Sequence, residues 1–299
     1  MLLSIRGFGI NSQASVSPIL GRSRRQIRRF ITKYKLATIG GLLVSLFLLM
    51  GILAPWVTPH DPNKISVNNT LRPPDDAYFL GTDDLGRDIF SRIIAGAQIS
   101  MVISLSAVGL ATITGVLLGN LAAWYNWLET PIMRLMDVLL SFPGIISALT
   151  IISILGSGLE NVIVAIMMFH IPQFARLAHG LTLGIKQNTY VTASLSVGAT
   201  DWRLLIRHIL PNILAPIIVQ MSLLIPDAIM TTAALSFLGL GVKPPTAEWG
   251  SMLQDSMRWA RSAPNLMIFP GLALMLVVFG FNTFGDGLRS ALDPTVGNK

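Results

Sequence analysis

Long apolar stretches, separated by short polar segments, dominate the pattern of the chain. An α-helix needs about 20 apolar residues to cross the hydrocarbon core of a membrane. The nearly charge-free stretches therefore predict six transmembrane helices, which fall within residues 36–59, 93–128, 138–159, 161–175, 209–240 and 262–285. The second stretch is longer than one crossing needs, so we expect it to include an approach segment or an exit loop. The fourth is short, so we expect its helix to continue past Arg176.

The composition points to the same class of protein. The 299 residues are 52% hydrophobic and 12% charged, with a mean hydropathy of +0.62. Because a soluble domain is about 25% charged, we expect an all-α fold that is integral to a membrane. The chain has no cysteine, which excludes disulfides, thiolate metal sites and cysteine nucleophiles.

The basic residues predict the orientation. Of the 22 Lys and Arg residues, 15 fall on the side of the membrane that holds the N-terminus and 7 on the other side. Cytoplasmic loops carry the excess of Lys and Arg, so both termini are predicted to be cytoplasmic. The net charge of +7 then fits basic loops and predicts no nucleic-acid partner. The expected organisation is a cytoplasmic N-terminal segment (1–35), a first transmembrane helix (36–58), an extracytoplasmic loop (59–92), a five-helix core (93–290) with a cytoplasmic loop at 176–212, and a cytoplasmic tail (291–299).

The polar segment between the fourth and fifth predicted helices, residues 190–212, has the pattern of a helix, a glycine turn and a second helix. Gly198 marks the turn, and Thr200 or Asp201 can cap the next helix. Pro211 is expected to begin the fifth transmembrane helix. The spacing leaves two interpretations open, an element offered to a cytosolic partner or an amphipathic connector on the membrane surface. The apolar face of the second helix consists of Trp202, Leu205, Ile206 and Ile209.

Three aspartates, Asp83, Asp84 and Asp88, gather in the first extracytoplasmic loop, which is too long to be a simple connection. Such a cluster can hold Mg²⁺ and a diphosphate, as in membrane prenyltransferases. That chemistry needs a second acidic cluster facing the same cavity, and the sequence shows one cluster, on the side away from cytosolic substrates. The simpler interpretation is a capped turn in which Arg87 pairs with a neighbouring Asp.

The cytoplasmic segment resembles the loop signature of bacterial ABC importer permeases, which has Glu-Ala-Ala, three further residues, Gly, and a stretch that ends in Leu-Pro. Here Thr192-Ala193-Ser194 stands where Glu-Ala-Ala is usual, while Gly198 and Leu210-Pro211 match. Because the Glu is missing, the resemblance implies no acidic contact at Thr192.

Three further stretches narrow the family, namely residues 81–92, 235–250 and 281–294. Together they resemble the C-type permease half of dipeptide and oligopeptide ABC importers, from about residue 56 onward. The resemblance implies a type I ABC importer transmembrane domain in the bacterial inner membrane, where ATP drives alternating access. The expected solute is a di- or oligopeptide, and the alternatives within the class are a nickel chelate, glutathione or an oligosaccharide.

The resemblance also implies the partners. They are a homologous second permease, two cytosolic ATP-binding subunits, an extracytoplasmic solute-binding protein and the lipid bilayer. ATP and Mg²⁺ are expected on the ATP-binding subunits, so this chain is expected to hold no cofactor or metal and to be no enzyme. Residues expected to couple to the ATPase are Ala193, Ser194, Gly198, Ala199, Asp201, Trp202, Arg203, Arg207, His208, Leu210 and Pro211. Residues expected to face the binding protein are Gly81, Thr82, Asp83, Gly86, Arg87, Asp88, Glu248, Trp249 and Gly250.

Asp227 is the only acidic residue deep within a predicted transmembrane helix, next to Pro226. A charge there is costly in lipid, so it must face protein or water. Two interpretations stay open. Asp227 either lines the solute pathway and favours a cationic group, such as a peptide amino terminus, or it makes an interhelical hydrogen bond. His170, in the preceding predicted helix, is expected to be a packing or hydrogen-bonding residue.

Two other classes of protein fit the sequence less well. The chain has no G-x-x-x-x-G-K-[ST] phosphate-binding loop, and no Ser/His/Asp set falls on one side of the membrane, so a membrane enzyme is disfavoured. A secondary transporter driven by an ion gradient predicts an internal inverted repeat and more ionisable residues in the membrane, and the sequence shows neither.

Overall fold

The structure, a computed structural model, describes residues 34–292. The predicted basic N-terminal segment and most of the predicted C-terminal tail therefore lie outside the described residues. Within residues 34–292 the chain forms helices and loops, with one isolated β-bridge between Thr82 and Asp88 and no strand. The expected all-α class is confirmed.

Five helices are long and apolar enough to cross a membrane. They are α2 (Lys35–Val57), α3 (Ile89–Trp124), α6 (Leu159–Lys186), the continuous helix formed by α8 (Asp201–Leu204), η2 (Leu205–Ile209) and α9 (Leu210–Phe237), and α11 (Asn265–Leu292). A sixth span exists if α4 (Asn126–Leu140) and α5 (Gly144–Leu155) count as one, although the pair is bent by 93°. The predicted number of six spans is therefore reached when the bent pair is counted as one span.

The prediction of the third span as one straight helix is therefore wrong. The break lies at Ser141 and Phe142, just before Pro143, which is the N-cap of α5. Proline disfavours helical geometry in the residue before it and offers no backbone N–H. These two effects end α4 and turn the chain before α5.

Two other predicted boundaries shift. The second predicted stretch, 93–128, holds most of α3, the non-helical Tyr125 that ends this helix and the first residues of α4, so an exit from the span does lie within it. The helix α3 itself has 36 residues, and at 1.5 Å per residue it is about 54 Å long, more than one crossing needs. The fourth continues past Arg176 to Lys186, as predicted. The predicted cytoplasmic loop at 176–212 consequently contracts to residues 187–200, which include α7 (Thr189–Ser196).

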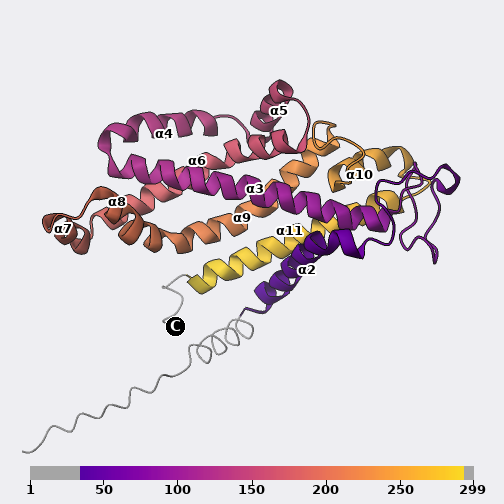
Figure 1. Cartoon of the computed structure of the whole chain (residues 1–299), viewed down its shortest axis with the longest axis horizontal. Coiled ribbons are helices and arrows are strands. Elements are labelled where there is room, and N and C mark those ends of the chain that lie inside the picture. Colours follow the sequence, from indigo (N-terminus) through magenta and orange to yellow (C-terminus); the bar gives the residue numbers. More distant parts are fainter. Residues whose placement is uncertain (1–33, 293–299) are drawn as a thin grey trace, which may run out of the picture.

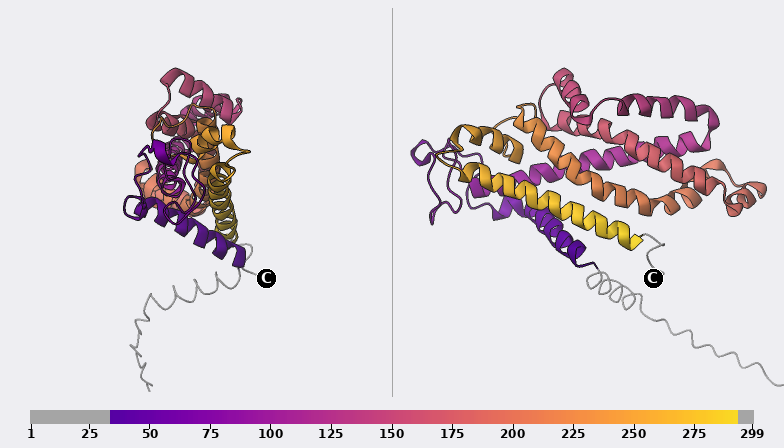
Figure 2. Two further views of the ribbon diagram at one scale, coloured as in Figure 1. Left: turned by 90° about the vertical axis from the view of Figure 1, so that its right-hand side faces the viewer. Right: turned by 180° about the vertical axis from the view of Figure 1, so that it is seen from behind.

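Small residues allow the long helices to approach closely. A Cβ atom built on Gly119 of α3 would lie 2.3 Å from the carbonyl oxygen of Ala175 on α6, and one built on Gly40 of α2 would lie 2.2 Å from the Thr283 hydroxyl on α11. Only glycine fits at such crossings, which are typical of membrane helix pairs. The pair α2 and α11 runs side by side in both Figure 1 and Figure 2.

The connecting segments gather at the two ends of this helical bundle. In Figure 1, α7 and α8 lie at one end, while α10 (Trp249–Ser256) and the loop between α2 and α3 lie at the other. That loop contains a short 3₁₀ turn, η1 (Val67–Asn69), and a second one, η3 (Met257–Trp259), follows α10. The two segments singled out by the sequence are therefore separated by the length of the helices.

Candidate functional site

The glycine turn between α7 and α8 is a helix C-cap. Gly198 has a φ of +83°, its N–H donates to the Leu195 carbonyl at 2.9 Å, and the Ala199 N–H donates to the Ser194 carbonyl at 3.1 Å. This pair of hydrogen bonds is the Schellman motif, which needs a left-handed residue at that position. The predicted turn is confirmed, and its backbone explains why glycine stands there.

Apolar side chains at this end of the bundle fall into two sets. Val191, Leu204 and Ile209 are fully buried and hold the segment on α6 and α9. Val197 is 87% exposed and Trp202 is 64% exposed, and Tyr190 and Leu195 are exposed as well. Several large apolar side chains exposed together at a helix end are typical of a protein contact surface.

The helix that follows differs from its prediction in two respects. Thr200 occupies the N-cap position but its side chain makes no capping hydrogen bond, and the helix runs without a break from Asp201 to Phe237. Pro211 therefore does not begin the transmembrane helix. The turn before it is π-helical, with the Leu210 N–H donating to the Leu205 carbonyl. A wider turn accommodates a proline, which has no N–H to continue the helical ladder.

Two residues missed as site residues join this segment to the end of α3. Lys186 donates through Nζ to the carbonyl oxygens of Ala123 and Trp124 at 3.1 and 3.0 Å, which satisfies orphan groups at the helix C-terminus. Tyr125 lies beside Asp201, and burial together with the Asp201 carboxylate raises the pKa of its phenol. Both contacts depend on tertiary packing, which no local sequence pattern indicates.

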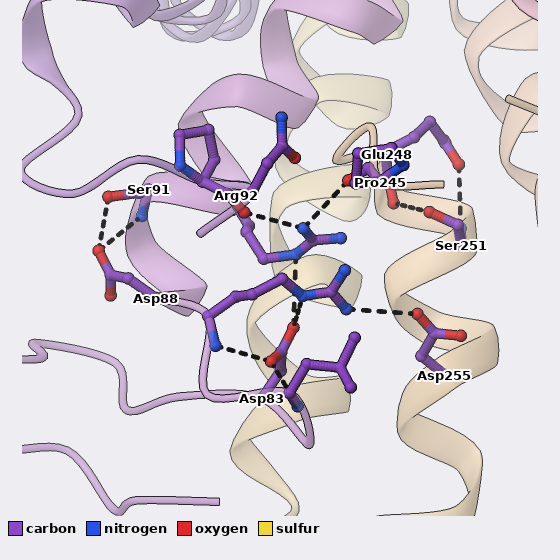
Figure 3. Close-up of polar contacts among 12 residues, drawn as sticks. Asp83, Asp88, Ser91, Arg92, Pro245, Glu248, Ser251 and Asp255 are labelled. Atoms are coloured by element: carbon purple, nitrogen blue, oxygen red, sulfur yellow. Dashed lines mark hydrogen bonds and ion pairs between the residues drawn. The ribbon is translucent and has the colours of Figure 1, made fainter. Parts of the chain in front are cut away.

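The loop between α2 and α3, which the sequence predicts to be extracytoplasmic and which we call the outer segment, is organised around Asp83 (Figure 3). One carboxylate oxygen of Asp83 accepts the backbone N–H groups of Leu85 and Arg87 at 2.9 Å, and the other accepts Nε of Arg87 at 2.6 Å. Asp88 caps α3 by accepting the N–H groups of Phe90 and Ser91 at 3.3 and 3.1 Å. The capped turn with an Arg87 ion pair is confirmed, and the carboxylates of Asp83 and Asp88 are occupied by protein donors, which argues against a magnesium–diphosphate site.

Arg92 ties the two outer loops together. Its Nη1 donates to the Pro62 carbonyl at 2.9 Å and to the Pro245 carbonyl at 3.4 Å. Arg87 reaches across to Asp255 of α10 at 3.8 Å, and burial raises the pKa of Asp255 while the nearby Arg87 opposes that shift. Neither Arg92 nor Asp255 was predicted as a site residue, because the residues that they join are far apart in the chain.

The start of α10 is buried. Glu248 caps the helix by accepting the Ser251 N–H at 3.0 Å, and burial raises the pKa of its carboxyl. Trp249 is 1% exposed. Both therefore contribute to the packing of the outer loops.

The residues predicted to face a binding protein lie inside the outer segment and the start of α10 rather than on their surface. All nine of those residues are buried, because their polar groups serve turns, caps and ion pairs inside the segment: Gly81, Thr82, Asp83, Gly86, Arg87, Asp88, Glu248, Trp249 and Gly250. The large side chains that do point outward from this loop include Ile65, Val67, Phe79 and Leu85. That the outer segment as a whole contacts the solute-binding protein stays a prediction.

Asp227 lies on α9 with its side chain 51% exposed, and its Oδ2 is 3.7 Å from Nε2 of His170 on α6. His170 is fully buried. The structure thus brings together two residues for which the sequence predicts no contact with each other.

Comparison with known proteins identifies the family of this chain. Residues 111–298 match the family described as binding-protein-dependent transport system inner membrane component, and residues 23–74 match the N-terminal TM domain of oligopeptide transport permease C. The chain belongs to this permease family. It is 45% identical over 269 residues to the glutathione transport system permease protein GsiD of Pectobacterium atrosepticum, covering 89% of each chain. It is 42% identical over 271 residues to the dipeptide transport system permease protein DppC of Alkalihalophilus pseudofirmus, covering 90% of this chain and 89% of that one.

The fold agrees with that assignment. A chain from an inward-facing structure of the MetNI methionine ABC transporter superposes with a TM-score of 0.55 at 18% identity, covering 67% of this chain and 96% of that one. The permease is thus a multi-pass inner-membrane subunit of an ABC importer with a type I transmembrane domain. It is not an enzyme, since ATP hydrolysis in this family belongs to partner ATPases, and the family also works with substrate-binding partners.

Proposed function

We propose that residues 189–211 are the element through which the partner ATPases drive this permease. The observation that carries the proposal is the rigid turn at Gly198, which holds exposed Val197 and Trp202 beyond the end of the bundle while buried neighbours anchor it. The coupling residues predicted from the sequence all lie in this segment. Among them, Gly198 supplies the turn, and Arg203 and Arg207 are exposed for contact.

The long helix that begins at Asp201 offers a route for the movement. Asp201–Phe237 is continuous over 37 residues, about 55 Å at 1.5 Å per residue. Displacement of Trp202 by an ATPase therefore moves the same continuous helix that carries Asp227. Such rocking of helices around a fixed site is the physical basis of alternating access.

The proposed assembly contains a homologous second permease, two ATP-binding subunits that hold ATP and Mg²⁺, and a solute-binding protein. The excess of Lys and Arg on the side of residues 189–211 supports cytoplasmic termini. The binding protein then meets the outer loops around Val67 and Phe79. This chain itself is proposed to hold no cofactor.

The proposed solute is a small peptide. The relatives named for glutathione and dipeptide transport support a short, peptide-like solute. A nickel chelate or an oligosaccharide is the alternative within the same class of importer.

Cysteine cross-linking tests the coupling element, because the chain has no cysteine of its own. Val197→Cys and Ala199→Cys are expected to cross-link to an ATP-binding subunit in the assembled complex, whereas Ala77→Cys in the outer loop is the matched control and is not. Labelling of Val197→Cys by an impermeant thiol reagent only from outside would refute both the orientation and the coupling role. ATP-driven uptake of dialanine or glutathione into proteoliposomes tests the solute class separately.

A further inference from the structure

Asp227 is a half-exposed carboxylate within a membrane-spanning helix. Its side chain is 51% exposed, and it lies ten residues before the end of α9 at Phe237, about 15 Å along the helix. A carboxylate facing lipid at such a depth is strongly disfavoured. The exposed side of Asp227 must therefore face water or protein in the assembled importer.

Other polar side chains lie on the same face of α9. Gln220 is seven residues before Asp227 and Thr231 is four residues after it, and both are partly exposed. Residues at spacings of four and seven share one face of a helix. The carboxylate thus belongs to a polar stripe, which is the expected lining of a hydrated path.

His170 holds an unusual position beside this stripe. It is fully buried, neither ring nitrogen has a hydrogen-bond partner, and its Nε2 is 3.7 Å from Oδ2 of Asp227. Buried polar atoms without partners are costly and normally find one. A small movement of Asp227 toward the ring is enough to form that hydrogen bond.

The carboxylate has no basic side chain to neutralise it within residues 34–292. His170 is its only ion-pair partner there, and no Lys or Arg nitrogen of this part of the chain comes within 4.0 Å. A cationic group of the solute is an electrostatic complement to such a carboxylate in a hydrated path.

We propose that Asp227 and His170 form a subsite for the ammonium group of the transported solute. Asp227 contacts the ammonium group, and His170 is a positioning residue that donates Nε2–H to the carboxylate and fixes its direction. This inference rests on the proposed function for its solute, and it adds the chemical group that the membrane path recognises.

A labelling experiment tests whether the subsite exists, and its result does not depend on which solute the importer carries. Thr231→Cys in the assembled importer is treated with a trimethylammonium and with a sulfonate methanethiosulfonate reagent. The ratio of the two reaction rates is expected to fall about tenfold when Asp227→Asn is added, because the carboxylate no longer concentrates cations. Ala77→Cys serves as the control whose ratio does not change. An unchanged ratio at Thr231→Cys, or no labelling there from either side, overturns the proposal.

The role of His170 has its own readout. His170→Gln keeps an N–H donor at the place of Nε2 and is expected to preserve the preference for the cationic reagent, whereas His170→Phe removes the donor and is expected to weaken it. If the two variants behave alike, His170 only fills space.

Uptake then connects the subsite to transport. With dialanine or glutathione as the probe, Asp227→Asn is expected to reduce the initial uptake rate about tenfold while Asp227→Glu keeps most of it. Equal uptake by the two variants overturns the proposal. If the wild-type importer takes up neither probe, the proposed solute class is wrong, and the labelling ratio still decides whether the subsite exists.

Discussion

The indole N–H of Trp249 donates to the carbonyl oxygen of Ile93 at 3.0 Å, across 156 residues of sequence. The same ring covers Gly96, where a Cβ atom would lie 2.7 Å from Cδ1 of Trp249. Phe47 of α2 packs against the same ring in a tilted arrangement at a centroid distance of 5.9 Å. Trp249 therefore fixes the outer loop before α10 to two membrane helices.

Gly96→Ala is expected to destabilise the permease by about 1–3 kcal/mol, the usual effect of adding volume to a filled site. Thermal unfolding of the purified complex measures this as a lower Tm. Gly109→Ala on the same helix is the matched control, since nothing lies within 4 Å of its added Cβ. Equal melting temperatures for the two variants would show that Trp249 can move aside without loss.

Arg87→Met is expected to loosen the outer segment. Arg87 is 5% exposed and its Nε is 2.6 Å from Asp83, and removal of one partner of a buried ion pair costs about 3–5 kcal/mol. Limited trypsin digestion at the exposed Arg72 is expected to become faster, and the Tm lower.

The double variant Asp83→Asn with Arg87→Met controls that prediction. Asparagine keeps the oxygen that accepts the Leu85 and Arg87 N–H groups and removes the charge left behind. The double variant is expected to be more stable than Arg87→Met alone. If it is less stable, the ion pair matters less than the separate contacts of each side chain.

Local patterns predicted much of this fold, because hydrophobic runs and single special residues act over a few positions. Five of the six apolar stretches became long helices, while the third fell on the bent pair α4 and α5, and Gly198 became the left-handed cap that its flanking helices required. The bend before Pro143 was missed because the apolar run continues through it, and hydropathy carries no information on backbone direction.

The candidate sites were less predictable than the spans. Whether Glu248 and Trp249 face a partner or the core depends on Gly96 and Ile93, which lie on another helix. The contact between His170 and Asp227 joins α6 to α9, and neither residue has a local pattern that indicates the other. The sequence shows that His170 and Asp227 are ionisable residues in predicted spans, but only the packed structure shows that they lie next to each other.

Glu248 predicts a pH dependence of stability. Burial raises the pKa of its carboxyl in the folded protein, so the folded state holds the proton more tightly than the unfolded state. Its contribution to stability is present below the unfolded pKa and is lost as the pH rises through the folded pKa.

Glu248→Gln tests this, because glutamine still offers an oxygen to the Ser251 N–H. The variant is expected to melt at a higher temperature than the wild type at pH 8, and the difference is expected to shrink towards pH 4.5. Melting curves at both values measure it. A difference that grows on acidification would contradict the assigned direction of the shift.

Gly198→Ala isolates the backbone contribution of the coupling turn. The φ of +83° is strained for any L-residue, and a Cβ there meets nothing within 4 Å, so strain is the only cost, about 1–2 kcal/mol. Asparagine tolerates left-handed geometry better than alanine, and valine is worse because of its branched Cβ. The expected order of Tm is wild type, Gly198→Asn, Gly198→Ala, Gly198→Val.

Gly184→Ala gives the matched control for that series. Gly184 lies inside α6, and a Cβ on it also meets nothing within 4 Å, but its φ is not positive. Alanine there is expected to raise the stability of the helix by up to about 1 kcal/mol. ATP-driven uptake should follow the order of the Gly198 series and be unaffected by Gly184→Ala, because only the turn sets the position of Val197 and Trp202. If Gly198→Val transports as well as the wild type, the rigid turn is not what transmits the movement of the ATPase.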